Sequence, residues 1–212
     1  MATKFSARDQ NNFNLWRKIF QYVACHWAIK GYVTCISGTY KFKVEGLENI
    51  DKNKYYIVAS NHVTGLDPFM ISAQINRTIA FMAKKQLFET FWSSVLMDWC
   101  GAFSVDREKV DVSTIKTALC VQKTKWDLGL FPQGKRCDNG KLENITKGFA
   151  SIAKKMKRDV LPVAIVIKDI ENSKRKEFII KAGKPISYDD ADLINKWAQA
   201  VCELSGLEYI PS

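Results

Sequence analysis

The stretch Tyr55–Pro68, YYIVASNHVTGLDP, decides the fold class. Its first six residues form an apolar run of the length of a strand, and the residues after it can form a helix over Pro68–Gln74 with Asp67 as the N-cap. A strand that leads through a short polar loop into a helix is a building unit of α/β folds, in which functional loops follow strand ends. The stretch predicts an α/β protein with a functional loop at Asn61–Asp67.

The rest of the chain continues this alternation. Further strands are predicted at Tyr40–Glu45, Thr78–Ala83, Leu128–Phe131, Val160–Ile167 and Glu177–Lys181, and further helices at Phe88–Cys100, Ser113–Trp126, Lys147–Lys157 and Asp189–Leu204. Because helices separate most of the strands, we expect a single-domain sandwich over residues 40–212, with a mixed, largely parallel sheet flanked by helices. The length of 212 residues fits one domain with an appended segment.

That appended segment is residues 1–39. Apolar and aromatic side chains recur there at steps of three and four residues: Phe13, Trp16, Phe20, Val23 and Trp27. The uncharged run Ile19–Ile29 covers only about half of the ~20 residues that a membrane-spanning helix needs. Tryptophan, tyrosine and basic residues favour the membrane interface. We expect an amphipathic membrane-association segment, peripheral or monotopic; the alternative is an amphipathic helix packed on the core.

Composition and charge limit the classes of partner. With 47% hydrophobic and 25% charged residues, the chain is not of the disordered class. Its net charge of +10 favours an acidic partner, which is nucleic acid, anionic lipid or an acidic protein. No helix-turn-helix, zinc-finger or aromatic RNA-binding pattern occurs, so we expect no nucleic-acid partner. Two histidines without a ligand cluster predict no metal site, and six scattered cysteines favour reduced thiols on the cytoplasmic side.

The loop Asn61–Asp67 carries the sharpest candidate chemistry. Asp67 follows His62 by five positions across a Thr-Gly turn, so its carboxylate can accept a hydrogen bond from one imidazole nitrogen. That bond would fix the tautomer and leave the other nitrogen free as a general base. The alternative is a surface histidine near an N-capping aspartate, and spacing alone does not choose between the two.

Three further segments accompany this loop in order. They are GAFSVDR at Gly101–Arg107, FPQGKR at Phe131–Arg136 and VLPVAI at Val160–Ile165. Together with NHVTGLD they resemble the four conserved blocks of the glycerolipid acyltransferase family, the lysophosphatidic acid acyltransferases and their relatives. The resemblance covers about residues 40–185.

This resemblance implies a function. Family members move an acyl group from a thioester, acyl-ACP (acyl carrier protein) or acyl-CoA (coenzyme A), to a glycerol hydroxyl. By resemblance, His62 is the general base and Asp67 its orienting partner. The expected acceptor is a lysophospholipid, above all 1-acylglycerol 3-phosphate, which gives phosphatidic acid. The expected setting is the cytoplasmic side of an anionic membrane surface, with the thioester as co-substrate and no cofactor.

The resemblance also assigns substrate-binding residues. Arg107 corresponds to the family's second-block arginine, associated with the acceptor phosphate, and a guanidinium can bind phosphate through two parallel hydrogen bonds. Lys84 and Arg136 are candidates for the same role, with solvated surface charge as the alternative for all three. The tetrahedral oxyanion needs donors, which we expect from backbone N–H groups near the His62 loop or Gly134. Asn61 is either a brace for the loop or a turn residue.

Gln133 departs from the family pattern, whose third block reads Phe-Pro-Glu-Gly-Thr-Arg. The family's glutamate is thought to hold the glycerol portion of the acceptor. Gln133 keeps an acceptor oxygen but loses the charge that strengthens such bonds. The alternative function is therefore a non-catalytic or altered-specificity lipid-binding member of the same fold.

An aromatic stripe recurs at helical spacing in the predicted helix Phe88–Cys100. It can line an acyl-chain groove or belong to the core, and we expect core; its members are Phe88, Phe91, Trp92, Val95, Leu96 and Trp99.

Overall fold

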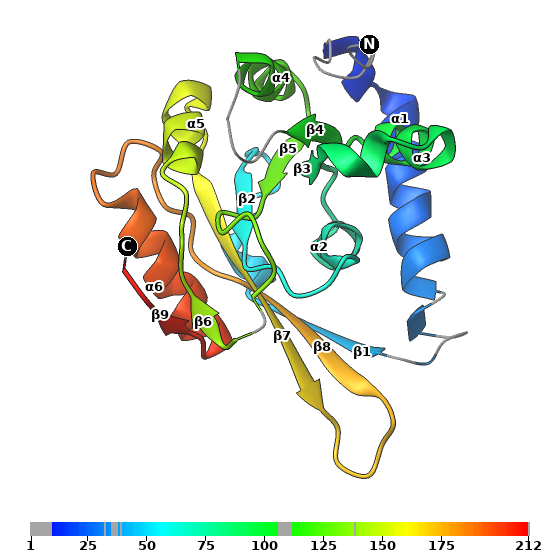
Figure 1. Cartoon of the computed structure of the whole chain (residues 1–212), viewed down its shortest axis with the longest axis vertical. Coiled ribbons are helices and arrows are strands. Elements are labelled where there is room, and N and C mark those ends of the chain that lie inside the picture. The colour runs from blue at the N-terminus through cyan, green and yellow to red at the C-terminus, as the bar shows by residue number, and fades with distance from the viewer. Residues whose placement is uncertain are drawn as a thin grey trace.

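The computed structural model of the chain describes residues 10–31, 33–34, 38, 40–105, 112–137 and 139–211. Seven strands form one sheet in the order β1-β8-β7-β2-β5-β3-β4 (Figure 1). They are β1 (Tyr40–Glu45), β2 (Ile57–Ser60), β3 (Ile79–Lys84), β4 (Phe103–Val105), β5 (Asp127–Leu130), β7 (Val160–Asp169) and β8 (Lys176–Ala182). In this sheet, as far as the described residues form it, β7 and β8 are antiparallel and the other neighbours are parallel. The predicted mixed sheet flanked by helices is confirmed.

The helices are mostly short. They are α1 (Leu15–Val23), α2 (Asp67–Gln74), α3 (Phe91–Trp99), α4 (Val112–Gln122), α5 (Gly148–Met156) and α6 (Leu193–Ser205). Single turns lie at η1 (Gln10–Phe13), at η4 (Leu47–Asn49) between β1 and β2, and at η5 (Lys85–Phe88), and the π-helical η2 (Ala24–Lys30) continues α1. Within the described ranges, no helix has both the length and the apolar character to cross a bilayer.

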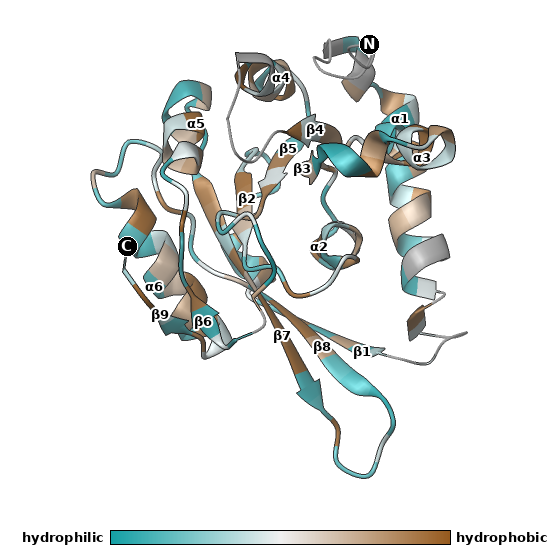
Figure 2. Ribbon diagram, viewed as in Figure 1, coloured by the Kyte–Doolittle hydropathy of each residue, from teal (hydrophilic) through white to brown (hydrophobic). Residues whose placement is uncertain are grey.

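Helices cover the sheet on two sides because its central strands are apolar on both faces. One side packs Leu128 and Val160 against α4, α5 and α6, where the Trp197 Nε1–H donates to the Ala59 carbonyl at 3.0 Å. The other side packs Val58 and Leu161 against α2. Figure 1 shows α5 and α6 on one side of the sheet and α2 on the other. The central strands are hydrophobic along their length, while the projecting end of the β7–β8 hairpin is hydrophilic (Figure 2).

Several predicted elements differ in their bounds. The helix predicted over Phe88–Cys100 divides into η5 and α3, because the Thr90 side chain accepts a hydrogen bond from the backbone N–H of Ser93 and restarts the helix. The helix predicted over Ser113–Trp126 ends at Gln122, and the one predicted from Asp189 begins at Leu193. Three short strands were not predicted: β4, β6 (Lys141–Leu142) and β9 (Glu208–Tyr209), of which β6 and β9 pair with each other.

A buried ion pair organises the amino-terminal edge of the parallel strands. Asp127, at the start of β5, accepts hydrogen bonds from Arg77 and from the backbone N–H of Tyr56 at 2.7 Å. Arg158, which precedes β7, donates to four carbonyls at the end of α4 and in the turn after it. Burial lowers the pKa of Arg158. This edge is built for stability, and the loops that carry the candidate chemistry lie at the opposite edge.

Candidate active site

The loop between β2 and α2 is organised by one buried carboxylate. The Asp67 Oδ2 atom accepts hydrogen bonds from His62 Nδ1 at 2.7 Å and from the backbone N–H groups of Val63 and Thr64 at 2.6 and 2.8 Å. Its Oδ1 atom accepts the Thr64 hydroxyl at 2.7 Å, and the side chain is fully buried. The prediction that Asp67 is the N-cap of the following helix is wrong. Asp67 is the first residue of α2, and its carboxylate turns back to bind the loop that precedes it.

The His62 ring is held from two sides. Asp67 holds its Nδ1 atom, and the Phe131 ring stacks on its face with a centroid distance of 4.1 Å and an interplanar angle of 18°. Phe81 of β3 continues the stack behind Phe131 at 5.6 Å. The Nε2 atom has no hydrogen-bond partner among the described residues. A histidine with one nitrogen bonded to a carboxylate and the other free has the arrangement of a general base.

Asn61 connects this loop to the next strand. Its side-chain Nδ2 donates to the Ile165 carbonyl at 2.9 Å, and its Oδ1 accepts from the Ile165 N–H at 2.7 Å. The amide thereby replaces a neighbouring strand for one residue of β7, and Asn61 is buried. Of the two alternatives left open by the sequence, these contacts are those of a brace.

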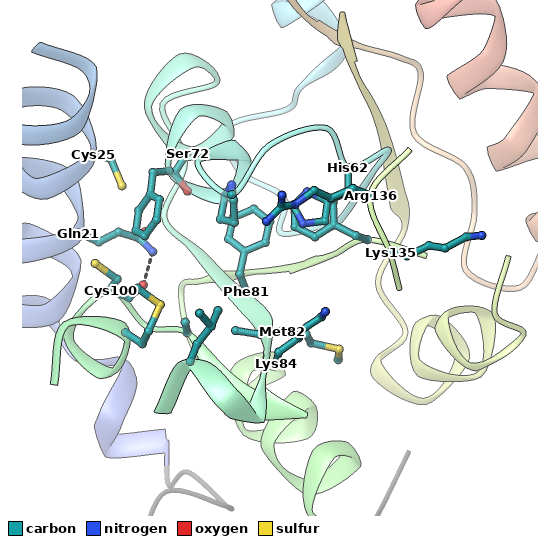
Figure 3. A pocket seen from close by; sticks show the side chains of 18 residues that line it. Gln21, Cys25, His62, Ser72, Phe81, Met82, Lys84, Cys100, Lys135 and Arg136 are labelled. Carbon is teal, nitrogen blue, oxygen red and sulfur yellow. Dashed lines mark hydrogen bonds between the residues drawn. The ribbon is translucent and has the colours of Figure 1, made fainter. Parts of the chain in front are cut away.

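His62 lines a cavity of about 440 Å³ that extends from the carboxyl ends of β2, β3 and β5 to α1 and α3. Three cations, Lys84, Lys135 and Arg136, are among its lining residues. Figure 3 shows Arg136 beside His62 at one end, which we call the cationic end, Phe81 in the middle with Lys84 below it, and Cys25 and Cys100 at the far end. The walls between the two ends are apolar, formed by side chains that include Phe81, Leu87, Met97 and Phe131. Such a cavity can accept a molecule with an anionic head and an apolar body.

Gln21 closes the far end of the cavity. Its Nε2 atom donates to the carbonyls of Ile79 and Cys100 at 2.7 and 2.6 Å, and its Oε1 atom accepts the Ile79 N–H at 3.0 Å. The neighbouring strand β4 pairs with β3 only from Met82 onward, so Ile79 lies beyond its reach. The side chain of Gln21 therefore supplies the hydrogen bonds that a longer β4 would have made. Sequence reasoning missed this residue, because a glutamine inside an aromatic stretch carries no visible signal of pairing.

Two thiols lie beside this closed end. Burial raises the pKa of Cys25 to about 12, with a smaller contribution from Cys100, and burial raises the pKa of Cys100 to about 11. Both are free thiols and line the cavity. They are protonated near neutral pH and act there as small apolar wall groups.

The predicted site residues divide into four groups. His62, Lys84 and Arg136 line the cavity, and Asn61 and Asp67 support it from behind. Gln133 and Gly134 are not among its lining residues. Arg107 lies outside the described residues.

The contacts of Gln133 and Gly134 lie within their own turn and toward β6. Gln133 is buried, and its Nε2 atom lies 3.5 Å from the Lys141 carbonyl of β6; its Oε1 atom has no hydrogen-bond partner among the described residues. The Gly134 N–H donates to the Phe131 carbonyl at 2.9 Å, and its φ of +66° favours glycine. The N–H groups of Val63 and Thr64 also have partners, so an oxyanion donor from these three residues would have to leave an existing bond.

Most of the aromatic stripe of the predicted helix Phe88–Cys100 neither forms the core nor lines the cavity. Phe88 is buried, but the prediction of a core position is wrong for the members that α3 exposes to solvent: Phe91, Trp92, Leu96 and Trp99. None of these four is a lining residue of the cavity. The physical reason is that α3 faces the protein with Ser94 and its neighbours and turns its apolar side outward.

Comparison with known proteins gives one consistent family. The Acyltransferase family model matches residues 41–166, which is more than half of the chain. A protein of Streptococcus pneumoniae named 1-acyl-sn-glycerol-3-phosphate acyltransferase is 31% identical over 175 residues, which cover 80% of this chain and 61% of that protein. The protein of the same name from Bacillus subtilis is 30% identical over 144 residues, covering 68% and 70%. The chain thus spans about two thirds of the length of these relatives.

A solved structure agrees at the level of the fold. The crystal structure of the 1-acyl-sn-glycerophosphate acyltransferase PlsC from Thermotoga maritima matches with a TM-score of 0.62 and 20% identity, covering 92% of this chain and 94% of that one. At this identity the likeness shows the shared fold. The family model and the relative from Bacillus subtilis show that the chain belongs to the acyltransferase family.

Proposed function

We propose that the chain transfers a fatty acyl group from an acyl thioester to the free hydroxyl of 1-acylglycerol 3-phosphate, giving phosphatidic acid. The observation that carries this proposal is the His62–Asp67 hydrogen bond at the wall of a cavity with one cationic end and apolar walls. The names of the relatives from Streptococcus pneumoniae and Bacillus subtilis support the choice of acceptor. The donor is a thioester of acyl carrier protein or of coenzyme A, and the assay below distinguishes them.

His62 acts as the general base. With Nδ1–H donated to Asp67, the Nε2 atom takes the proton of the acceptor hydroxyl as that oxygen attacks the thioester carbonyl carbon. The tetrahedral intermediate then collapses, the C–S bond breaks, and the leaving sulfur takes the proton back from Nε2. Asp67 stabilises the imidazolium that exists between these two transfers. A thioester is activated enough for this direct attack, so no acyl-enzyme is required.

The cationic end of the cavity binds the acceptor phosphate. Lys84 ends β3 and Arg136 follows β5, so the two residues line the cavity from the carboxyl ends of neighbouring strands. Neither has an opposite-charge partner among the described residues, whereas Lys135 is paired with Glu143 at 3.1 Å. Charge-assisted hydrogen bonds from these groups suit a phosphate monoester. Arg107 is proposed as a further contact on the strength of the resemblance alone.

The acyl chain occupies the apolar part of the cavity, and the α1–η2 segment docks the protein on an anionic membrane. In α1 the buried side chain is the polar Gln21, while Leu15, Trp16 and Ile19 are exposed. This polarity is inverted relative to a helix that packs on a core, and it supports interfacial binding. The segment Phe13–Lys30 carries Arg17, Lys18 and Lys30 without any acidic residue, which suits an anionic, cytoplasmic leaflet.

The alternative, a non-catalytic lipid-binding member of the family, rested on Gln133. Because Gln133 faces β6 and is not a lining residue of the cavity, the amide in place of the family's carboxylate leaves the surroundings of His62 as they are. This position favours the catalytic proposal over the alternative.

The test is an acyl-transfer assay of the purified chain. A panel of lysolipids with phosphate, choline, ethanolamine and glycerol head groups is offered with acyl-ACP and, separately, with acyl-CoA, and products are identified by mass spectrometry. Phosphatidic acid formed from 1-acylglycerol 3-phosphate at the highest rate supports the proposal. If the thioester is not consumed with any of the acceptors, the proposal is overturned. A faster reaction with another head group would reassign the acceptor.

A further inference from the structure

Helix α3, like α1, buries a polar side chain and exposes most of its apolar side chains. Its buried side chain is Ser94, and the stripe Trp92, Leu96 and Trp99 recurs at steps of four and three residues on the exposed side. The Phe91 and Trp92 side chains are 72% and 80% exposed, compared with 74% for Trp16 on α1. Adjacent large apolar side chains with this degree of exposure mark an interaction site.

The two helices form one surface because polar contacts join them. The Arg17 guanidinium of α1 binds the Asp98 carboxylate at 2.5 Å and the Asp98 carbonyl at 3.0 Å. The Phe20 and Trp99 rings pack at 5.4 Å, and Gln21 binds the carbonyl of Cys100, which follows α3. The ion pair is largely shielded from solvent by both helices. Figure 1 shows α1 and α3 next to each other at one end of the sheet.

This surface adjoins the cavity. Leu87, in the turn before α3, is exposed and also lines the cavity, and Met97 of α3 lines it from inside. The same helix therefore presents one side to the cavity and the opposite side to the surroundings. A lipid that reaches the cavity from a bilayer would travel a short way along this apolar helix.

We propose that α3 is the second half of the membrane-docking surface, and that Phe91, Trp92, Leu96 and Trp99 enter the interfacial layer of an anionic bilayer alongside α1. The proposal deepens the proposed function, because it names the helix through which the cavity meets the lipid surface. Aromatic side chains favour this depth, and long Lys side chains can reach the head groups beside them.

Charge favours a bilayer over a second copy of the chain as the occupant. Over residues 13–30 and 84–99, the segments that carry and adjoin the apolar surface, five basic residues outnumber two acidic ones, Glu89 and Asp98, and Arg17 already neutralises Asp98. The basic residues are Arg17, Lys18, Lys30, Lys84 and Lys85. In a symmetric dimer this excess of positive charge would face itself across the interface. Anionic head groups instead attract it.

The experiment measures flotation of the full chain with large unilamellar vesicles of phosphatidylcholine containing phosphatidylglycerol. The variant is Phe91→Ser combined with Trp92→Ser, and the control is Leu47→Ser, an exposed apolar residue on η4, which lies against β8. We expect at least tenfold weaker vesicle binding for the double variant and binding within about twofold of the parent for the control. Unchanged binding by the double variant would overturn the proposal.

Further measurements distinguish the possible outcomes. Circular dichroism and thermal unfolding establish that the double variant is folded, and Phe91→Leu with Trp92→Leu, which retains apolar character, is expected to restore at least half of the binding. Sedimentation velocity tests a second copy of the chain as the occupant. If the parent self-associates and the double variant does not, while vesicle binding is unchanged, the surface belongs to a dimer.

Acyl transfer is assayed separately with vesicle-borne and monomeric short-chain lysolipid. If the double variant loses acyl transfer to the vesicle-borne lysolipid but keeps it with the monomeric one, the proposal is supported. If the parent transfers acyl groups to neither acceptor, the proposed function is refuted and the flotation result remains valid.

Discussion

The rings of His62 and Phe131 lie face to face, 4.1 Å apart and 18° from parallel. Asp67 fixes the His62 ring in its plane through Nδ1, and Phe131 fixes the tilt of that plane. Because Phe81 supports Phe131 from behind, the orientation of the imidazole is set by β3 and by the residue that follows β5, in addition to its own loop. A base that must meet a hydroxyl within about 3 Å depends on such positioning.

Replacing Phe131 with Leu tests the stack. We expect kcat to fall about ten- to a hundredfold, since a small misplacement of a catalytic group has effects of this size, while KM for the acceptor stays within about threefold. Phe131→Tyr keeps the ring face and should retain most of the rate. A kcat equal to the parent in Phe131→Leu would show that the stack has no part in positioning His62.

Asn61 is expected to be a stability determinant. In Asn61→Ala the Ile165 N–H and carbonyl both lose their partner in a buried position, so the free energy of unfolding should fall by about 1–3 kcal/mol in urea denaturation. Asn53→Ala, an exposed asparagine, should change it by less than about 0.5 kcal/mol. Equal stability of the two variants would contradict the role of Asn61 as a brace.

Gln133→Glu separates the two views of the third block. A carboxylate at this buried position loses the amide donor that faces the Lys141 carbonyl, so we expect lower stability, by about 1–3 kcal/mol, and no gain in acyl-transfer rate. Gln86→Glu is the matched control, because Gln86 is exposed. An increase in rate for Gln133→Glu would instead show that the amide weakens a catalytic or acceptor-binding role.

Thiol labelling checks the closed end of the cavity. Burial destabilises the thiolate, so at pH 8 a pKa of about 12 leaves on the order of one Cys25 in ten thousand ionised. Cys25 and Cys100 should therefore resist N-ethylmaleimide in the native chain and react in urea, as read by peptide mass spectrometry. Rapid labelling of either in the native chain would mean that this end of the cavity is open.

The sequence was sufficient for six of the seven strands of the main sheet and for part of the site. Each long apolar run became a strand because its residues can be buried on both faces, and the five-residue spacing of His62 and Asp67 led to the predicted hydrogen bond. The roles that the sequence could not predict depend on contacts between segments that are distant in the chain. Gln21 replaces hydrogen bonds that the short strand β4 does not make, and Phe131 stacks on His62.

The outward-facing aromatics of α3 were predicted wrongly for a related reason. An apolar stripe at helical spacing indicates that one side of a helix avoids water, but the pattern is the same whether a protein core or a bilayer covers that side. The deciding evidence was the opposite side of the helix, where the buried residue is Ser94.

The central claim is that His62 is the base of an acyl transfer. The most direct measurement is the initial rate of phosphatidic acid formation from 1-acylglycerol 3-phosphate and the preferred thioester, comparing the parent chain with His62→Ala at equal folded concentration. We predict a loss of at least a thousandfold with an unchanged unfolding transition, because no other described side chain in the cavity has a free imidazole or carboxylate. Turnover by His62→Ala at the parent's rate would contradict the mechanism.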